Sequence, residues 1–196
     1  MKAPVYMALV HHPVLDKTGA TVTTAITNLD VHDLARSART YGLAGYFVVT
    51  PISAQRAILD RILAHWGEGG AGRKRVPERG EALSRVRPVD SIEEAIAQIE
   101  ADTGQRPRIV ATAARSKGQA PVSWAAGSAA LREGPTLILF GTGRGLVEET
   151  LASADLLLAP IRPGGYNHLS VRAAAAITLD RLFGDGDPDG GHGDGV

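Results

Sequence analysis

The chain has 196 residues, of which 44% are hydrophobic and 21% charged, the balance of a globular domain. It contains no cysteine, which excludes disulfide frameworks, zinc–thiolate sites, iron–sulfur clusters and thiol nucleophiles. Its 21 Lys and Arg residues balance 21 Asp and Glu residues, so attraction to nucleic acid must come from a local patch. The apolar runs are short and the first residues lack a signal-peptide pattern, so we expect a cytoplasmic protein without a membrane partner.

Short runs of apolar and β-branched residues alternate along the chain with segments of helical periodicity. The pattern predicts, in chain order, a strand at 5–10, a helix at 31–41, a strand at 46–50, helices at 54–66 and 91–102, strands at 108–112, 136–140 and 156–159, and a final helix at 168–183. The strands are continuously apolar, as in parallel strands that helices cover on both faces. We therefore predict an α/β domain with a mostly parallel sheet flanked by helices.

Two stretches lie outside this pattern. Residues 67–80 are rich in glycine and basic side chains, and we expect a mobile loop in which Arg73, Lys74 and Arg75 bind RNA phosphates. A solvated loop that happens to be basic fits the same composition. Residues 185–196 contain mainly glycine and aspartate, so we expect a disordered acidic tail after a domain that covers 1–184.

The segment FGTGRGL follows directly on the strand predicted at 136–140. Its three glycines stand at alternate positions, where the lack of a Cβ lets a ligand approach the backbone. The spacing fits neither the dinucleotide fingerprint G-x-G-x-x-G nor the P-loop G-x-x-x-x-G-K-[ST]. A tight strand-to-helix turn is the structural alternative. The candidate binding residues are Phe140, Gly141, Thr142, Gly143, Arg144, Gly145 and Leu146.

Two other polar loops also follow predicted strands. Because the carboxyl ends of parallel strands meet at one edge of a sheet, where open α/β proteins bind ligands, we expect all three loops to lie together. One of the two contains Thr112, Ala113 and Ala114. The other leads into an alanine-rich helix, and its candidate residues are Pro160, Ile161, Tyr166, Asn167, His168, Leu169, Ser170 and Val171.

Five motifs, taken together and in this order, resemble the SPOUT class of S-adenosylmethionine-dependent RNA methyltransferases, and within it a bacterial subfamily of uncharacterised RNA methyltransferases. They are TNLD at 27–30, HDLARSARTYG at 32–42, TAAR at 112–115, FGTGRGL at 140–146 and YNHLSVR at 166–172. The resemblance covers essentially residues 1–184. One departure is Arg144, where the subfamily usually has an aromatic residue.

The resemblance implies a fold with a C-terminal trefoil knot, a homodimer and a tRNA or rRNA substrate. It also implies that the three loops bind S-adenosylmethionine, with no metal. A ribose 2′-hydroxyl is our main hypothesis for the methyl acceptor, because Arg36 stands six residues before Gly42, as in the ribose-methylating branch of the class. A base nitrogen is the alternative within the class. A protein that keeps the pocket but has lost turnover is the alternative outside it.

Three residues are candidates for the chemistry. Arg36 would reach across from a partner subunit to bind a phosphate and orient the hydroxyl, since a guanidinium stays protonated. Arg39 lies on the same helical face and could bind the same phosphate, although two surface arginines of an amphipathic helix would show the same spacing. Asp30 could take the proton from a guanine nitrogen, or could simply cap the helix that starts beside it.

Overall fold

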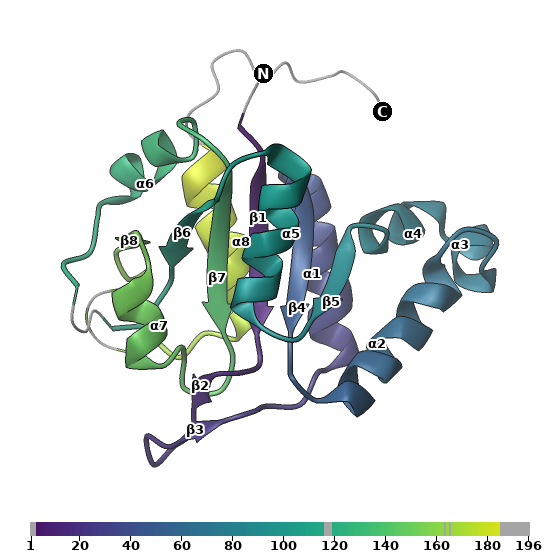
Figure 1. Cartoon of the computed structure of the whole chain (residues 1–196), viewed down its shortest axis with the longest axis horizontal. Coiled ribbons are helices and arrows are strands. Elements are labelled where there is room, and N and C mark those ends of the chain that lie inside the picture. Colours follow the sequence, from purple (N-terminus) through teal and green to yellow (C-terminus); the bar gives the residue numbers. More distant parts are fainter. Residues whose placement is uncertain (1–2, 116–118, 163, 165, 185–196) are drawn as a thin grey trace.

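A six-stranded sheet forms the centre of the computed structural model, which describes residues 3–115, 119–162, 164 and 166–184. All five strand pairs in this sheet are parallel, and the strand order is β5-β4-β1-β7-β6-β8 (Figure 1). This confirms the predicted α/β class with a parallel sheet. The strands are β1 (Val5–Val10), β4 (Gly45–Val49), β5 (Val86–Val89), β6 (Arg108–Ala111), β7 (Thr136–Gly141) and β8 (Leu156–Leu157).

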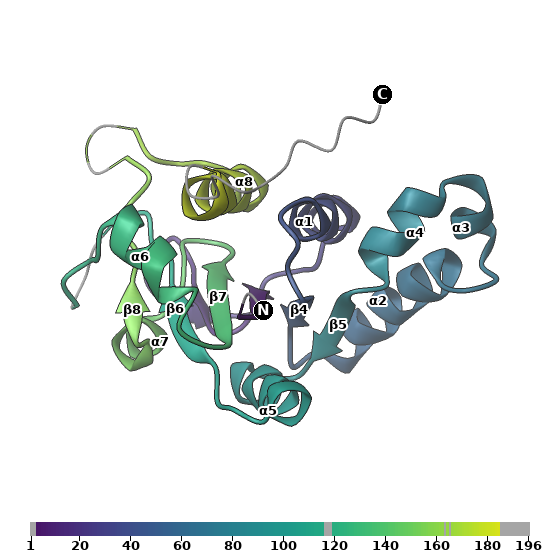
Figure 2. The ribbon, with the colours of Figure 1, turned by 90° about the horizontal axis from the view of Figure 1, so that it is seen from above.

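Helices cover both faces of the sheet, which explains why the strands are apolar on both sides. Figure 2 shows α1 (Asn28–Thr40) and α8 (Val171–Phe183) side by side on one face, with α5 (Ile92–Thr103) on the other. Successive residues of β1 alternate between two cores: Met7 packs in the core under α1 and α8, and Ala8 in the core under α5. The remaining helices are α2 (Ser53–Trp66), α3 (Ala71–Arg75), α4 (Pro77–Leu83), α6 (Trp124–Ala130) and α7 (Glu148–Ser153).

Hydroxyl side chains fix where the main helices begin. The side chain of Thr27 accepts a hydrogen bond from Asp30 N at the start of α1, and Ser170 does the same for Ala173 N at the start of α8. Ser91 caps α5, as its S-x-x-E pattern predicts. Thr27, rather than Asp30, is therefore the N-cap of α1, which leaves the Asp30 carboxylate for other contacts.

The prediction of a mobile loop at 67–80 was wrong, because this stretch contains α3 and α4. Pro77 stands at the first turn of α4, where its missing N–H costs nothing. Gly80 is buried, and a Cβ there would lie 2.9 Å from Trp66 O and 2.6 Å from Arg73 Cγ. Its role is therefore close packing of α4 against the end of α2, not flexibility.

Strand β5 was not predicted, because Pro88 interrupts its apolar run. The structure places β5 at the edge of the sheet, where it pairs only with β4. An edge strand tolerates a proline, since one side of its backbone needs no ladder hydrogen bonds. β8 is also shorter than the predicted strand and has two residues.

A small hairpin, β2 (Val14–Leu15) and β3 (Thr21–Val22), joins β1 to α1 and lies below the carboxyl edge of the sheet (Figure 1). Within the described ranges, no helix is long and apolar enough to cross a membrane. The predicted tail at 185–196 lies outside the described residues.

Candidate functional site

The three loops expected to bind a ligand line one hollow at the carboxyl edge of β6, β7 and β8. The hollow has a volume of about 1200 Å³. Of the predicted cofactor residues, all line it except Pro160 and Tyr166, and Tyr166 is 84% exposed. Pockets for drug-sized ligands have volumes of about 300–1,000 Å³, so this hollow has room for a cofactor and part of a substrate together.

A hydrogen bond between two of the loops holds the hollow in shape. Asn167 Nδ2 donates to Ala114 O at 2.7 Å, which ties the loop after β8 to the loop after β6. Thr112 Oγ1 donates to Leu139 O at 2.8 Å and so attaches the loop after β6 to β7. Asn167 therefore joins two of the loops, and Thr112 fastens one of them to the sheet.

The glycine-rich loop after β7 is braced by the β2–β3 hairpin. Arg144 N donates to Leu15 O at 2.8 Å, and Leu15 N donates to Gly145 O at 2.9 Å. Gly143 has a φ of +60°, and a Cβ there would lie 2.8 Å from Leu15 O. The expected reason for this glycine, close approach of a ligand, is therefore incomplete, because the hairpin already requires it.

A partly buried chain of polar side chains contacts the same loop. Thr142 Oγ1 donates to Val10 O at 3.0 Å and lies 2.5 Å from Thr24 Oγ1, which in turn lies 2.9 Å from His11 Nδ1. Since the Thr142 proton goes to the carbonyl, Thr24 donates to Thr142, and His11 Nδ1 carries the proton donated to Thr24. Burial lowers the pKa of His11 to about 4, so its imidazole is neutral at physiological pH.

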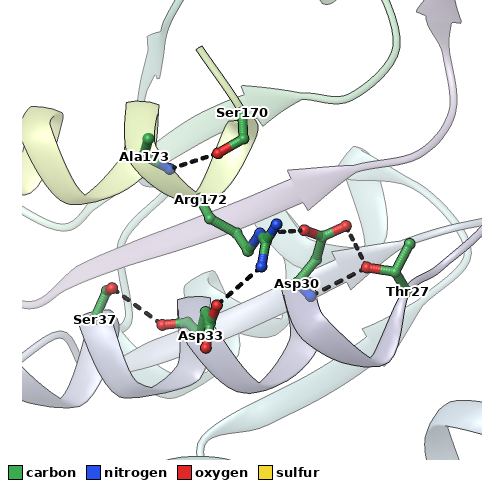
Figure 3. Close-up of polar contacts among 7 residues, drawn as sticks. All are labelled: Thr27, Asp30, Asp33, Ser37, Ser170, Arg172 and Ala173. Carbon is green, nitrogen blue, oxygen red and sulfur yellow. Dashed lines mark hydrogen bonds and ion pairs between the residues drawn. The ribbon is translucent and has the colours of Figure 1, made fainter.

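An arginine of α8 joins two carboxylates of α1 at the rim of the hollow (Figure 3). Arg172 Nε lies 3.3 Å from Asp30 Oδ1, and Arg172 Nη1 donates to Asp33 Oδ2 at 3.1 Å. Thr27 Oγ1 donates to Asp30 Oδ2 at 2.7 Å. The Asp30 side chain is only 15% exposed. The structure thus holds the carboxylate of Asp30 in one position beside the three loops.

The two arginines predicted to act on the substrate lie elsewhere in the subunit. Arg36 is exposed on α1 and lines a separate hollow. Arg39 forms an ion pair with Glu81 of α4, with Nη2 2.6 Å from Oε1. Its guanidinium is therefore already paired within the chain, which weakens the hypothesis that it shares a phosphate with Arg36.

Three further predictions concern side chains on or near the surface. Arg144 is exposed and lines the loop hollow. Arg73, Lys74 and Arg75 belong to α3 and line neither of the two hollows, so their part in RNA binding stays a prediction. No group of three or more potential metal ligands occurs among the described side chains, and the absence of a metal from the reaction also stays a prediction.

Sequence reasoning gave no role to Arg172 or Thr24. Arg172 is the last residue of the YNHLSVR motif, so its place in that motif was the available signal. The role of Thr24 becomes visible only in the fold, because Thr24 and Thr142 are 118 residues apart in sequence.

Comparison with known proteins identifies a family model and relatives that match most of this chain. A family model described as "SAM-dependent RNA methyltransferase" matches residues 4–184. A protein of Oleidesulfovibrio alaskensis named "tRNA (guanine-N(1)-)-methyltransferase" is 50% identical over 181 residues, which are 92% of this chain and 42% of that protein. An uncharacterized protein of Aquifex aeolicus is 41% identical over 91% of this chain and 88% of its own length. This chain thus spans less than half the length of the named relative.

The fold is similar to that of a solved Aquifex aeolicus TrmH/SpoU tRNA modifying enzyme. The TM-score is 0.54, with 14% sequence identity, over 93% of this chain and 74% of that one. The similarity confirms a SPOUT-like architecture. The trefoil knot itself stays a prediction.

Proposed function

The chain belongs to the family of S-adenosylmethionine-dependent RNA methyltransferases, and we propose that it methylates tRNA at a base nitrogen of guanine. The main hypothesis from the sequence was a ribose 2′-hydroxyl. The base nitrogen is now better supported, because the relative that is 50% identical is named for guanine-N1 methylation of tRNA. That name belongs to a protein of which 42% matches this chain, so the choice of acceptor needs support from the site.

The position of Asp30 carries the proposal. A guanine N1 bears a proton that must leave when the nitrogen is methylated, and a nearby carboxylate can accept it. Asp30 lines the loop hollow, whereas Arg36 lines a different one. Within one subunit, the residue suited to base methylation is therefore beside the loops, and the residue suited to ribose methylation is not.

The size and polar lining of the loop hollow suit S-adenosylmethionine. The hollow is lined by glycine backbone from the loop after β7 and by the polar side chains of Thr112 and Asn167. S-adenosylmethionine held by these loops would supply an electrophilic methyl group for the acceptor nitrogen. Positioning is the protein's main contribution to such a transfer.

The remaining chemistry belongs to side chains of this chain. Asp30 would take the N1 proton on whichever carboxylate lone pair faces the hollow, since an ionised carboxylate has about four acceptor sites. Arg172 and Thr27 hold that carboxylate in place from two sides. In this mechanism Arg172 is a positioning residue, because it acts through its contact with Asp30.

A ribose 2′-hydroxyl is kept as the second candidate on one observation. Within the described part of the chain, Arg36 has no carboxylate at ion-pair distance, so its guanidinium is available to a phosphate. For Arg36 to act at the loop hollow, it would have to come from a second subunit.

Nucleoside mass spectrometry after incubation of the protein with labelled S-adenosylmethionine and unmodified tRNA tests the proposal. We expect methylguanosine with the label on the base. Asp30→Asn should lower turnover by about a hundredfold, the usual scale for loss of a general base, and leave cofactor affinity near the wild-type value. The matched control is Asp60→Asn, which makes the same change at an exposed carboxylate on α2. Label on ribose, with Asp30→Asn active and Arg36→Ala inactive, would contradict the base assignment.

A further inference from the structure

A second hollow, of about 570 Å³, lies between α1, α2 and α4. Three guanidinium groups line it, from Arg36, Arg61 and Arg79. Two imidazoles, from His32 and His65, and the indole of Trp66 also line it. The proposed transfer of a methyl group uses none of Arg61, Arg79 or Trp66.

Among the described residues, few carboxylates face the positive charge of this hollow. Its one lining carboxylate is Asp33, which is already bound to Arg172. Taking only the described ranges, neither Arg61 nor Arg79 has a carboxylate at ion-pair distance. The pKa of His32 is lowered, first by burial and then by the charge of Arg79. Unpaired guanidinium groups around a concave surface attract phosphate.

The hollow also offers an aromatic wall. The guanidinium carbon of Arg79 lies 5.2 Å from the centre of the Trp66 ring. The rings of His32 and His65 meet the same indole edge-on, with centroids 5.5 and 5.4 Å away. Leu29, at the mouth, is 61% exposed. Aromatic and guanidinium planes next to phosphate-binding groups are the combination that binds unpaired nucleotides.

The two hollows are neighbours along one helix. Asp30 lines the loop hollow and Asp33 lines the second one, and Arg172 binds both carboxylates (Figure 3). The first turns of α1 therefore form the wall between them. An RNA strand that places one nucleotide in the loop hollow would place an adjoining one near the second.

From this arrangement we propose that the second hollow binds a phosphate and an unpaired base of the substrate RNA, next to the nucleotide that is methylated. Arg61 and Arg79 hold the phosphate, and Trp66 forms the wall against which the base packs. This inference rests on RNA being the substrate, but it does not depend on which atom receives the methyl group.

The test is tRNA binding by the full chain, measured by fluorescence anisotropy with S-adenosylhomocysteine present. In the double variant Arg61→Ala, Arg79→Ala we expect tRNA affinity to fall at least about tenfold, while the affinity for S-adenosylhomocysteine stays within twofold. Two lost phosphate contacts should also reduce the slope of log affinity against log salt by about 1.5. Arg61→Lys should bind tRNA more tightly than Arg61→Ala but less tightly than the wild type, since an ammonium group replaces the charge of a guanidinium but not its planar pair of donors.

The matched control removes the same charge away from the second hollow, at the end of the sheet where β6 and β7 begin. Arg106→Ala with Arg132→Ala changes two exposed arginines that precede β6 and β7, and should leave tRNA affinity within twofold of the wild type. Melting temperatures of both double variants show whether each is folded. If Arg79→Ala unfolds the protein, the single variant Arg61→Ala carries the test, with an expected slope change of about half.

Competition by AMP and by inorganic phosphate separates an RNA site from a site for small anions. We expect weak competition from AMP and less from phosphate, with both lost in the double variant. Unchanged tRNA affinity in the folded double variant would overturn the proposal, whatever the small anions do. If the wild type binds tRNA through these arginines but transfers no methyl group, this inference stands and the proposed function fails.

Discussion

Replacing Gly143 by alanine tests whether the β2–β3 hairpin sets the shape of the cofactor loop. Gly143 has a φ of +60°, and a Cβ at this position would lie 2.8 Å from Leu15 O. That oxygen is backbone, so it cannot move aside without shifting the hairpin. It also accepts the hydrogen bond from Arg144 N, and Leu15 N donates to Gly145 O. The substitution therefore acts on the conformation, on the contact and on both hydrogen bonds.

The cost can be worked out from these contacts. A left-handed backbone costs an L-residue about 1–2 kcal/mol. Each backbone hydrogen bond contributes about 0.5–1.5 kcal/mol net, so losing two costs about 1–3 kcal/mol. We expect Gly143→Ala to lower the free energy of unfolding by about 2–5 kcal/mol. Because the displaced loop lines the hollow, affinity for S-adenosylmethionine should fall at least about tenfold, or 1.4 kcal/mol.

Alanine variants of two nearby glycines separate the cost of backbone strain from the cost of the contact with Leu15. Gly145 has a φ of +107° and Gly19 a φ of +86°, and a Cβ on either would meet no atom within 4 Å. Their alanine variants should lose about 1–2 kcal/mol of stability from backbone strain alone. Gly19→Ala, at the tip of the hairpin, should also keep its cofactor affinity. Urea denaturation gives the stability, and calorimetry with S-adenosylmethionine gives the affinity.

The reasoning fails if Gly143→Ala loses no more stability than Gly145→Ala, since the contact with Leu15 would then count for nothing. It fails also if Gly143→Ala loses the expected stability but binds the cofactor as the wild type does. In that case the hairpin would stabilise the fold without shaping the loop.

Three further predictions concern the buried histidine, the ion pairs and assembly. Burial lowers the folded pKa of His11 to about 4, below the unfolded value of about 6.5. The free energy of unfolding should therefore fall by up to about 3 kcal/mol as the pH drops from the unfolded to the folded value. Urea denaturation of His11→Asn from pH 7 to pH 4 should not show this fall. Arg172→Met should lower turnover more than cofactor affinity, because Asp30 loses a positioning contact; equal losses in both, measured by calorimetry and initial rates, would contradict that role. Sedimentation should show a two-fold homodimer, which the half-exposed Ala173 and Ala176 of α8 suit; a monomer at micromolar concentration would rule out an Arg36 that acts across subunits.

The sequence determined the fold class, the main helices and the three loops, because these depend on local patterns. Continuous apolar runs marked β1, β4, β6 and β7, and helical spacing marked α1, α2, α5 and α8. Where a parallel sheet is known, loops after its strands must meet at one edge. The family resemblance then connected those loops to S-adenosylmethionine. The match over residues 4–184 confirms the cofactor, and its binding by these loops stays a prediction.

Local patterns failed where tertiary packing reverses their meaning. The glycines and basic residues at 67–80 indicated a mobile loop, yet Gly80 is buried where α4 packs on the end of α2. No strand was predicted at 86–89, which contains Pro88, yet β5 occupies an edge position that tolerates a proline. In both cases the deciding contact is with a residue outside the local pattern.

Only the tertiary structure decided how the candidate residues divide between two hollows. The sequence placed Asp30, Arg36 and Arg39 in two adjacent motifs, with no indication of what each side chain would face. The fold then placed Arg172 of α8 beside Asp30, Glu81 of α4 beside Arg39, and Arg79 and Trp66 in the same hollow as Arg36. These partners come from other helices, and their positions follow from how the helices pack on the sheet, which one-dimensional periodicity does not specify.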